Sequence, residues 1–136
     1  MSGHLSRHAN PNKNRTPRHR AREFALQGLY QWLMSHEDAG VIDAYIRNAH
    51  GFDKADRSHF DVLLHGTIRD AANLRTEIVP YIDRAIDQLS PIEHAALLIG
   101  AYELKQHIEI PYKVVINGVL DKLASKLRAT EVGAAR

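Results

Sequence analysis

One long stripe of apolar side chains constrains the fold of this chain more than any other feature. Between Asp56 and Val79 such residues recur at intervals of three and four, which places them on one face of an α-helix. Pro80 should end this helix, because proline disfavours helical geometry at the residue before it. A helix with such a stripe needs other elements to cover it. The residues of the stripe are Phe60, Leu63, Leu64, Thr67, Ile68, Ala71, Leu74 and Ile78.

Similar spacing predicts further helices on both sides of the stripe, and we find no alternating pattern of a β-strand. One helix is expected from Arg18 to about His36. A short second helix is expected over 41–49 and should end at the turn around Gly51. A further helix is expected over 81–89, between the long stripe and the next helix start.

The clearest helix start is the capping box Ser90-Pro91-Ile92-Glu93, in which the serine and glutamate side chains each accept a bond from a backbone N–H of the first turn. The residues that follow it, 95–102, are apolar on nearly every side, as expected for a helix enclosed by others. Pro111 begins the last predicted helix, whose apolar side continues to Leu127. The chain is therefore expected to be all-α.

Charge is distributed unevenly, although the net charge is only +2. Residues 1–22 contain six Lys and Arg and no Asp or Glu, whereas the remaining 12 of the 18 basic residues face all 16 acidic ones. Residues 1–17 also have almost no apolar side chains, so they cannot bury enough surface to offset the entropy of ordering. We expect a flexible basic tail over 1–17 and one domain over 18–136.

Several functional classes find no support in the sequence. There is no cysteine, no apolar signal segment, and no run approaching the roughly 20 apolar residues of a membrane span, so we expect a soluble, cytoplasmic protein. Phosphate-binding glycine loops and the common hydrolase motifs are missing. Glu103 and His107 are four apart but lack the other ligands of a helical metal site, which favours a surface pair. We expect no catalysis, no metal and no cofactor.

The run Arg18-His19-Arg20-Ala21-Arg22 is the strongest candidate for a binding site. It joins the basic arm to the first turn of a helix, whose N-terminus is itself partly positive, and such a place attracts phosphate. From composition alone, a solvated basic tail is an equally good interpretation.

Three tyrosines lie at the edges of apolar stripes, where they could stack on unpaired bases or anchor a protein interface. Core packing is the more frequent role of a tyrosine at helical spacing, and we favour it for Tyr102. For Tyr30 and Tyr81 the residues alone also favour core packing, and only the resemblance to a known family raises a binding role above it.

Several motifs, taken in order, resemble those of the NusB family. Arg20-Ala-Arg-Glu-Phe-Ala-Leu followed by Leu29-Tyr30-Gln-Trp32 resembles the first helix of that family. The later motifs are Leu89-Ser-Pro-Ile-Glu93, Ile99-Gly-Ala-Tyr-Glu-Leu104, Ile110-Pro-Tyr-Lys-Val-Val-Ile-Asn117 and Gly118-Val-Leu-Asp-Lys-Leu-Ala124. Together they cover nearly everything after Thr16.

The resemblance implies a compact bundle of about six to seven helices in two packed sub-bundles. It also implies a function in transcription antitermination. In this family the protein pairs with a small-subunit ribosomal protein, NusE, and the pair binds boxA RNA within the elongation complex of ribosomal RNA operons.

The resemblance also assigns roles to individual residues. Arg18, Arg20 and Arg22 match the arginine-rich RNA-binding start of the first helix, with His19 where an arginine is common. Tyr81 matches a further RNA-binding position. The expected partner-binding residues are Tyr30, Asp87 and Glu93, and for Glu93 a partner contact is compatible with capping its own helix.

One departure concerns the junction of Asn117 and Gly118. The family reads on from the Val-Val-Ile-Asn motif through about twenty residues of helix and turn before the Gly-Val-Leu-Asp-Lys motif. Here the two motifs are adjacent. A true deletion and a stretch omitted from the sequence both fit this junction, and a true deletion should reduce RNA affinity.

A second functional class stays open beside the first. A helical protein-interaction module, either a homodimer or a protein-only adaptor, would have the same fold and use the basic arm only for solvation. Binding to boxA-type RNA, with and without the ribosomal partner, separates the two classes.

Overall fold

The computed structural model describes residues 15–106, and in this part the chain is all-α, as predicted. It contains four α-helices and three short 3-10 helices, without any strand between Arg15 and Gln106. The α-helices are α2 (Pro17–Ser35), α3 (Ala39–Arg47), α4 (Arg57–Ile78) and α5 (Pro91–Lys105). The 3-10 helices are η2 (Phe52–Lys54), η3 (Val79–Tyr81) and η4 (Ile86–Gln88).

Side-chain caps begin the three longest helices. The Thr16 hydroxyl accepts a hydrogen bond from the His19 N–H at 3.0 Å, and Pro17 occupies the first turn of α2. Thr16 and Pro17, which the sequence analysis placed in the tail, therefore belong to the start of α2. Asp56 caps α4 in the same way, through the His59 N–H at 3.0 Å.

The predicted capping box at the start of α5 is confirmed. The Ser90 hydroxyl accepts from the Glu93 N–H at 3.2 Å, and the Glu93 carboxylate accepts from the Ser90 N–H at 2.9 Å.

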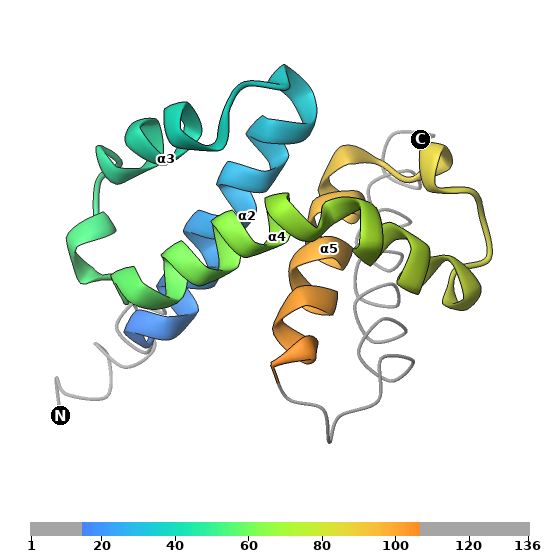
Figure 1. Cartoon of the computed structure of the whole chain (residues 1–136). Coiled ribbons are helices and arrows are strands. Elements are labelled where there is room, and N and C mark those ends of the chain that lie inside the picture. The colour runs from blue at the N-terminus through green and yellow to red at the C-terminus, as the bar shows by residue number, and fades with distance from the viewer. Residues whose placement is uncertain (1–14, 107–136) are drawn as a thin grey trace, which may run out of the picture.

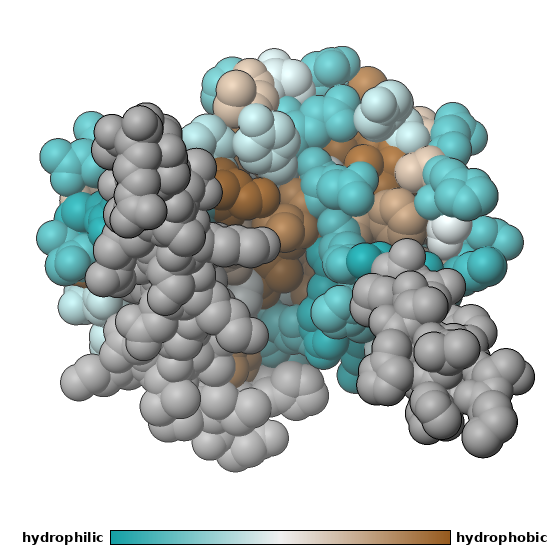
Figure 2. Space-filling view, turned by 180° about the vertical axis from the view of Figure 1, so that it is seen from behind, coloured by the Kyte–Doolittle hydropathy of each residue, from teal (hydrophilic) through white to brown (hydrophobic). Residues whose placement is uncertain are grey.

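Helix α4 lies in the centre of the described part, with α2 and α5 crossing it and α3 outermost (Figure 1). Its predicted stripe forms the middle of the core, where Phe60, Leu63 and Leu74 are fully buried. Figure 2 views the opposite face, on which apolar side chains gather in the middle and polar side chains surround them. Burial of the apolar side chains of the α4 stripe and of the helices that cover it is the main force that holds the helices together.

Two glycines allow the helices to approach closely at their crossings. A Cβ atom on Gly66 of α4 would lie only 2.2 Å from the hydroxyl of Tyr102 on α5. A Cβ on Gly28 of α2 would lie 2.8 Å from a methyl group of Leu64 on α4. Tyr102 is only 7% exposed, so its predicted place in the core is confirmed.

The helix predicted over 81–89 is wrong. This segment contains only η3 and η4, with extended backbone at Ile82 and Ala85 between them. Its apolar residues still face the core, since Leu89 is buried and Ile86 packs against the core as a half-buried side chain. Length is not the reason, since α3 is equally short and helical; the apolar side chains of 81–89 reach the core without helix formation.

The last predicted helix, which begins at Pro111, and the junction of Asn117 and Gly118 lie outside the described residues. The division into two sub-bundles stays a prediction, as does the total of six to seven helices. None of the helices within 15–106 combines the length and hydropathy that crossing a membrane would require.

Candidate functional site

The first turn of α2 presents basic side chains to the surface. Arg18 and His19 are exposed and Arg20 is half-buried. The His19 Nε2 lies 3.6 Å from a carboxylate oxygen of Glu23, one turn further along the helix. Cationic groups and the N–H groups of the first turn therefore lie together at the positive end of a helix, which is an arrangement suited to phosphate.

Arg22 differs from these residues because its side chain points toward α5. Its guanidinium donates a bidentate set of bonds to the Glu103 carboxylate, with distances of 2.7 and 2.9 Å. The exposed fractions of the two side chains are 42% for Arg22 and 17% for Glu103. Arg22 thus joins the start of α2 to the end of α5, and a phosphate would have to compete with Glu103 for it.

The electrostatics of Glu103 agree with this pairing. Burial alone would raise the pKa of Glu103, but the hydrogen bonds and charge of Arg22, with His59 at 3.3 Å, bring it below its ordinary value. Glu103 is therefore half-buried and paired with Arg22 and His59. Its proposed neighbour His107 lies outside the described residues.

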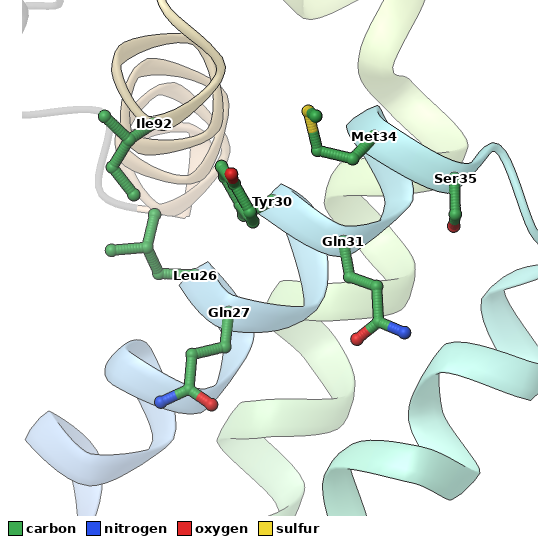
Figure 3. A pocket seen from close by; sticks show the side chains of 7 residues that line it. All are labelled: Leu26, Gln27, Tyr30, Gln31, Met34, Ser35 and Ile92. Carbon is green, nitrogen blue, oxygen red and sulfur yellow. The ribbon is translucent and has the colours of Figure 1, made fainter.

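The second half of α2 forms one wall of an apolar groove of about 490 Å³ (Figure 3). Leu26, Tyr30 and Met34 follow one another at turns of α2, and Ile92 from α5 closes the opposite side. The exposed fractions of Tyr30 and Met34 are 42% and 57%. Exposed large apolar side chains around a concave surface are typical of a protein-binding site.

Tyr81 and Asp87 lie in the connection between α4 and α5, away from the start of α2. Both are exposed, Tyr81 at the end of η3 and Asp87 within η4. The start of α4 contacts the start of α2 through a backbone bond from the Asp56 N–H to the Pro17 carbonyl at 3.0 Å. Because α4 has 22 residues, Tyr81 lies about 33 Å further along its axis. The structure does not bring Tyr81 together with the arginines.

Glu93 is only 3% exposed, and its carboxylate is engaged in the capping box. Arg84 provides a second, longer contact, with its Nη1 at 3.9 Å from the carboxylate. The capping role expected for Glu93 is thus observed. Its exposed neighbour Ile92, which the sequence analysis did not single out, offers the accessible surface at this place.

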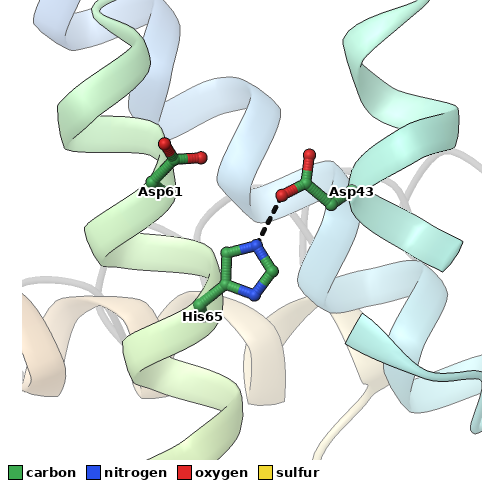
Figure 4. A group of neighbouring side chains, drawn as sticks. All are labelled: Asp43, Asp61 and His65. Carbon is green, nitrogen blue, oxygen red and sulfur yellow. Dashed lines mark hydrogen bonds and ion pairs between the residues drawn. The ribbon is translucent and has the colours of Figure 1, made fainter. Parts of the chain in front are cut away.

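Asp43, Asp61 and His65 form a cluster between α3 and α4 whose ligand atoms lie within 4.8 Å of one another (Figure 4). The guanidinium of Arg47 bonds both carboxylates, and His65 bonds Asp43. An arginine that already donates hydrogen bonds to both carboxylates opposes a second cation between them. The cluster therefore joins α3 to α4 as an ion-pair network, in which Arg47 also lies over the rings of Phe52 and Phe60 at 5.5 and 5.7 Å.

Fold and surfaces together define a small all-α protein in which one helix, α2, has a basic first turn and borders an apolar groove. The NusB family profile matches residues 19–133. The chain is 52% identical to the transcription antitermination protein NusB of Ralstonia pickettii over 141 residues, which cover 90% of this chain and 91% of the relative. The chain belongs to the NusB family.

Other relatives agree with this result. The chain is 52% identical to the transcription antitermination protein NusB of Paraburkholderia phymatum, with 89% of this chain and 97% of the relative covered. With the protein of the same name from Bordetella pertussis it shares 49% identity, over 89% of this chain and 94% of the relative.

The length of the match bears on the shortened junction. Ninety percent of 136 residues is about 122, so about 19 of the 141 positions matched to the Ralstonia pickettii protein have no residue in this chain. A gap of this size is close to the block of about twenty residues expected at the junction of Asn117 and Gly118, and its place in the chain stays a prediction.

Proposed function

We propose that this protein is an RNA-binding transcription antitermination factor that acts as an adaptor between RNA and a ribosomal protein. The observation that carries the proposal is the arrangement of α2. Its first turn exposes Arg18 and His19, and its second half exposes Tyr30 in an apolar groove. The membership of the chain in the NusB family supports the same function.

The basic start of α2 would bind boxA-type single-stranded RNA of ribosomal RNA operons. Arg18, His19 and Arg20 would contact phosphates, which gives affinity and salt dependence with little sequence information. Tyr81 would contact the same strand further on, by stacking on a base. The roughly 33 Å between these places requires an RNA that stays extended along the protein.

Arg22 would contribute to RNA binding mainly by positioning. Its bond to Glu103 holds the first turns of α2 against α5, so the neighbouring arginines are presented in a fixed place. The arginine side chains then lose less conformational entropy when RNA binds.

The apolar groove would bind the ribosomal protein NusE. Tyr30 is the expected anchor, because a tyrosine contributes a large contact area with few rotatable bonds and keeps a polar tip. Asp87 would contribute at the polar rim. The protein would act by binding within the elongation complex in the cytoplasm, without catalysis.

The test is a gel shift of boxA-type RNA by the full chain, with and without the ribosomal partner, for the wild type and the double variant Arg18→Ala, Arg20→Ala. We expect tight binding to need the partner. Each lost arginine should weaken binding about tenfold, and together they should reduce the salt slope by about 1.4.

Arg69→Ala is the matched control, because Arg69 is exposed on α4, 12 residues or about 18 Å along the helix from Arg57. Equal affinity and salt slope for the wild type and the double variant would overturn the RNA assignment. A homodimer that ignores RNA would instead support the protein-only module.

A further inference from the structure

A second pocket lies beside the basic start of α2, and neither the arginine motif nor the apolar groove accounts for it. Its volume is about 360 Å³, and it separates the first turns of α2 from the turn that precedes α4. Arg15, Arg20 and Phe24 line one side, and His50 and Lys54 line the other. A volume of this size is at the lower end of the range of small-ligand pockets, roughly 300–1,000 Å³.

The charge of this pocket favours an anion. Three cationic side chains, Arg15, Arg20 and Lys54, line it together with one carboxylate, that of Glu23. Glu23 is already paired, with Arg15 at 2.7 Å and with His19 at 3.6 Å. Lys54 is exposed and has no ion pair within residues 15–106. A phosphate between Arg20 and Lys54 would meet a described lining of three cationic side chains and one carboxylate, which is net positive by count.

The wall that carries Lys54 is fixed before any ligand binds. Gly51 begins this turn with a φ of 88°, a backbone conformation that favours glycine. The buried ring of Phe52 lies edge-on to Phe24 and Phe60, with centroid distances of 5.3 and 4.9 Å. A turn anchored in the core in this way loses little conformational entropy when a ligand enters.

The remaining lining residues suit a base. Phe24 and His50 offer aromatic surfaces for stacking, and the Gln27 amide offers one donor and one acceptor for the edge of a base. An anion-binding group next to aromatic and amide side chains matches the two parts of a nucleotide. The pocket is also continuous with the first turn of α2, because Arg20 belongs to both.

We infer that this pocket holds one nucleotide of the bound RNA, with its phosphate between Arg20 and Lys54 and its base against His50 and Phe24. This inference rests on the proposed function, since the RNA is the one that the start of α2 would bind. It adds a second element, the turn 50–54, to the RNA-binding surface. Neither the arginine motif nor the periodicity of the sequence indicates that turn.

The experiment measures RNA affinity by fluorescence anisotropy, with the full chain, the ribosomal partner and a labelled boxA-type RNA. Lys54→Ala should weaken binding about fivefold and lower the salt slope by about 0.7, the amount of one phosphate contact to a single strand. Lys54→Arg should restore most of the affinity. His50→Ala should weaken binding about fivefold without changing the slope, because it removes a stacking surface.

Both side chains are exposed, so circular dichroism of each variant should match that of the wild type. Arg69→Ala again serves as the control. RNA substituted with 5-iodouridine, irradiated in the complex and digested, should give a crosslink on the peptide that contains His50.

The outcomes separate this inference from the proposed function. If Arg18→Ala, Arg20→Ala weakens binding while Lys54→Ala and His50→Ala do not, the proposed function stands and the pocket is not part of the RNA site. If the chain binds no RNA even with its partner, both are overturned.

Discussion

The two halves of α2 differ in almost every property although they belong to one continuous helix. The first half has basic side chains, begins with the Thr16 cap and borders a polar pocket. The second half has Tyr30 and Met34 exposed over an apolar groove. One helix thereby fixes the distance between a surface suited to RNA and a surface suited to protein, which is what an adaptor requires.

The halves also differ in how they are held against the rest of the molecule. Arg22 fastens the first half to α5 through a charged, bidentate bond to Glu103. The second half is fastened through Trp32, over which Arg75 of α4 lies at 5.9 Å from the ring centroid. Arg75 in turn donates to the Nε2 of His94 on α5 at 3.0 Å. One anchor uses a carboxylate and the other a neutral imidazole, so acid should affect them differently.

The largest effect on partner binding should come from a change in the apolar half of α2 alone. Tyr30→Asp places a charge in the groove and removes the anchor, so the affinity for the ribosomal partner should fall about 30-fold, or about 2 kcal/mol. RNA binding by the chain alone should change little. Titration calorimetry measures the affinity for the partner, and fluorescence anisotropy measures the RNA affinity of the chain alone.

Tyr45→Asp is the matched control for this change. Tyr45 is even more exposed than Tyr30, at 64%, but lies on α3 outside the groove. An equal loss of partner affinity in both variants would mean that the groove is not the partner site.

A smaller effect, on stability, should follow from removing the ion pair that holds the basic half of α2 against α5. Glu103→Gln removes the charge that Arg22 faces, and we expect a loss of about 1–2 kcal/mol in the free energy of unfolding, moderated because Arg22 is partly solvated. Urea unfolding at neutral pH measures it. Glu37→Gln, at an exposed glutamate just after α2, should leave the midpoint unchanged.

The same variant, Glu103→Gln, decides whether Arg22 positions α2 or contacts the RNA directly. If Glu103→Gln lowers both the stability and the RNA affinity, Arg22 acts by holding α2 in place. Stronger RNA binding would instead place Arg22 among the direct RNA contacts, because Glu103 would no longer compete with a phosphate for its guanidinium.

Much of this arrangement could be predicted from the sequence because its signals are local. The stripe of α4 and the capping box of α5 each depend on residues within a few turns of one another. The segment 81–89 has the same kind of spacing and the length of α3 but forms only 3-10 turns, so only its burial was predictable. Tyr30 and the start of α2 could be assigned through the family resemblance.

The remaining features depend on contacts between distant segments. Arg22 and Glu103 are 81 positions apart, and no spacing rule joins them. The same holds for Gly66 and Tyr102, where a glycine inside a helix is explained only by the ring packed against it. The second wall of the basic pocket, at Lys54, is likewise brought to α2 by the fold and not by the sequence pattern.

The smallest expected effect is the change of stability with falling pH. Its direction follows from the Arg22–Glu103 and Arg75–His94 bonds that hold the two halves of α2. Burial and the charge of Arg75 lower the pKa of His94, so its neutral ring can accept the bond from Arg75. The unfolded chain takes up this proton near the ordinary value of about 6.5. The contribution of His94 to stability is therefore complete above that pH and decreases as the pH falls toward the lowered pKa.

The pKa of Glu103 is also lowered, so its contribution is complete above the ordinary glutamate value of about 4.3 and is lost below it. On acidification, the anchor of the apolar half should therefore weaken before that of the basic half. Urea midpoints measured from pH 7.5 to about pH 3 should fall less steeply below about 6.5 for His94→Gln than for the wild type, because Gln can still accept from Arg75 but does not titrate. The profile of Glu103→Gln should differ from the wild type in slope only at the acid end. If both variants follow the wild-type slope over the whole range, the two halves of α2 are not held by separately titrating anchors.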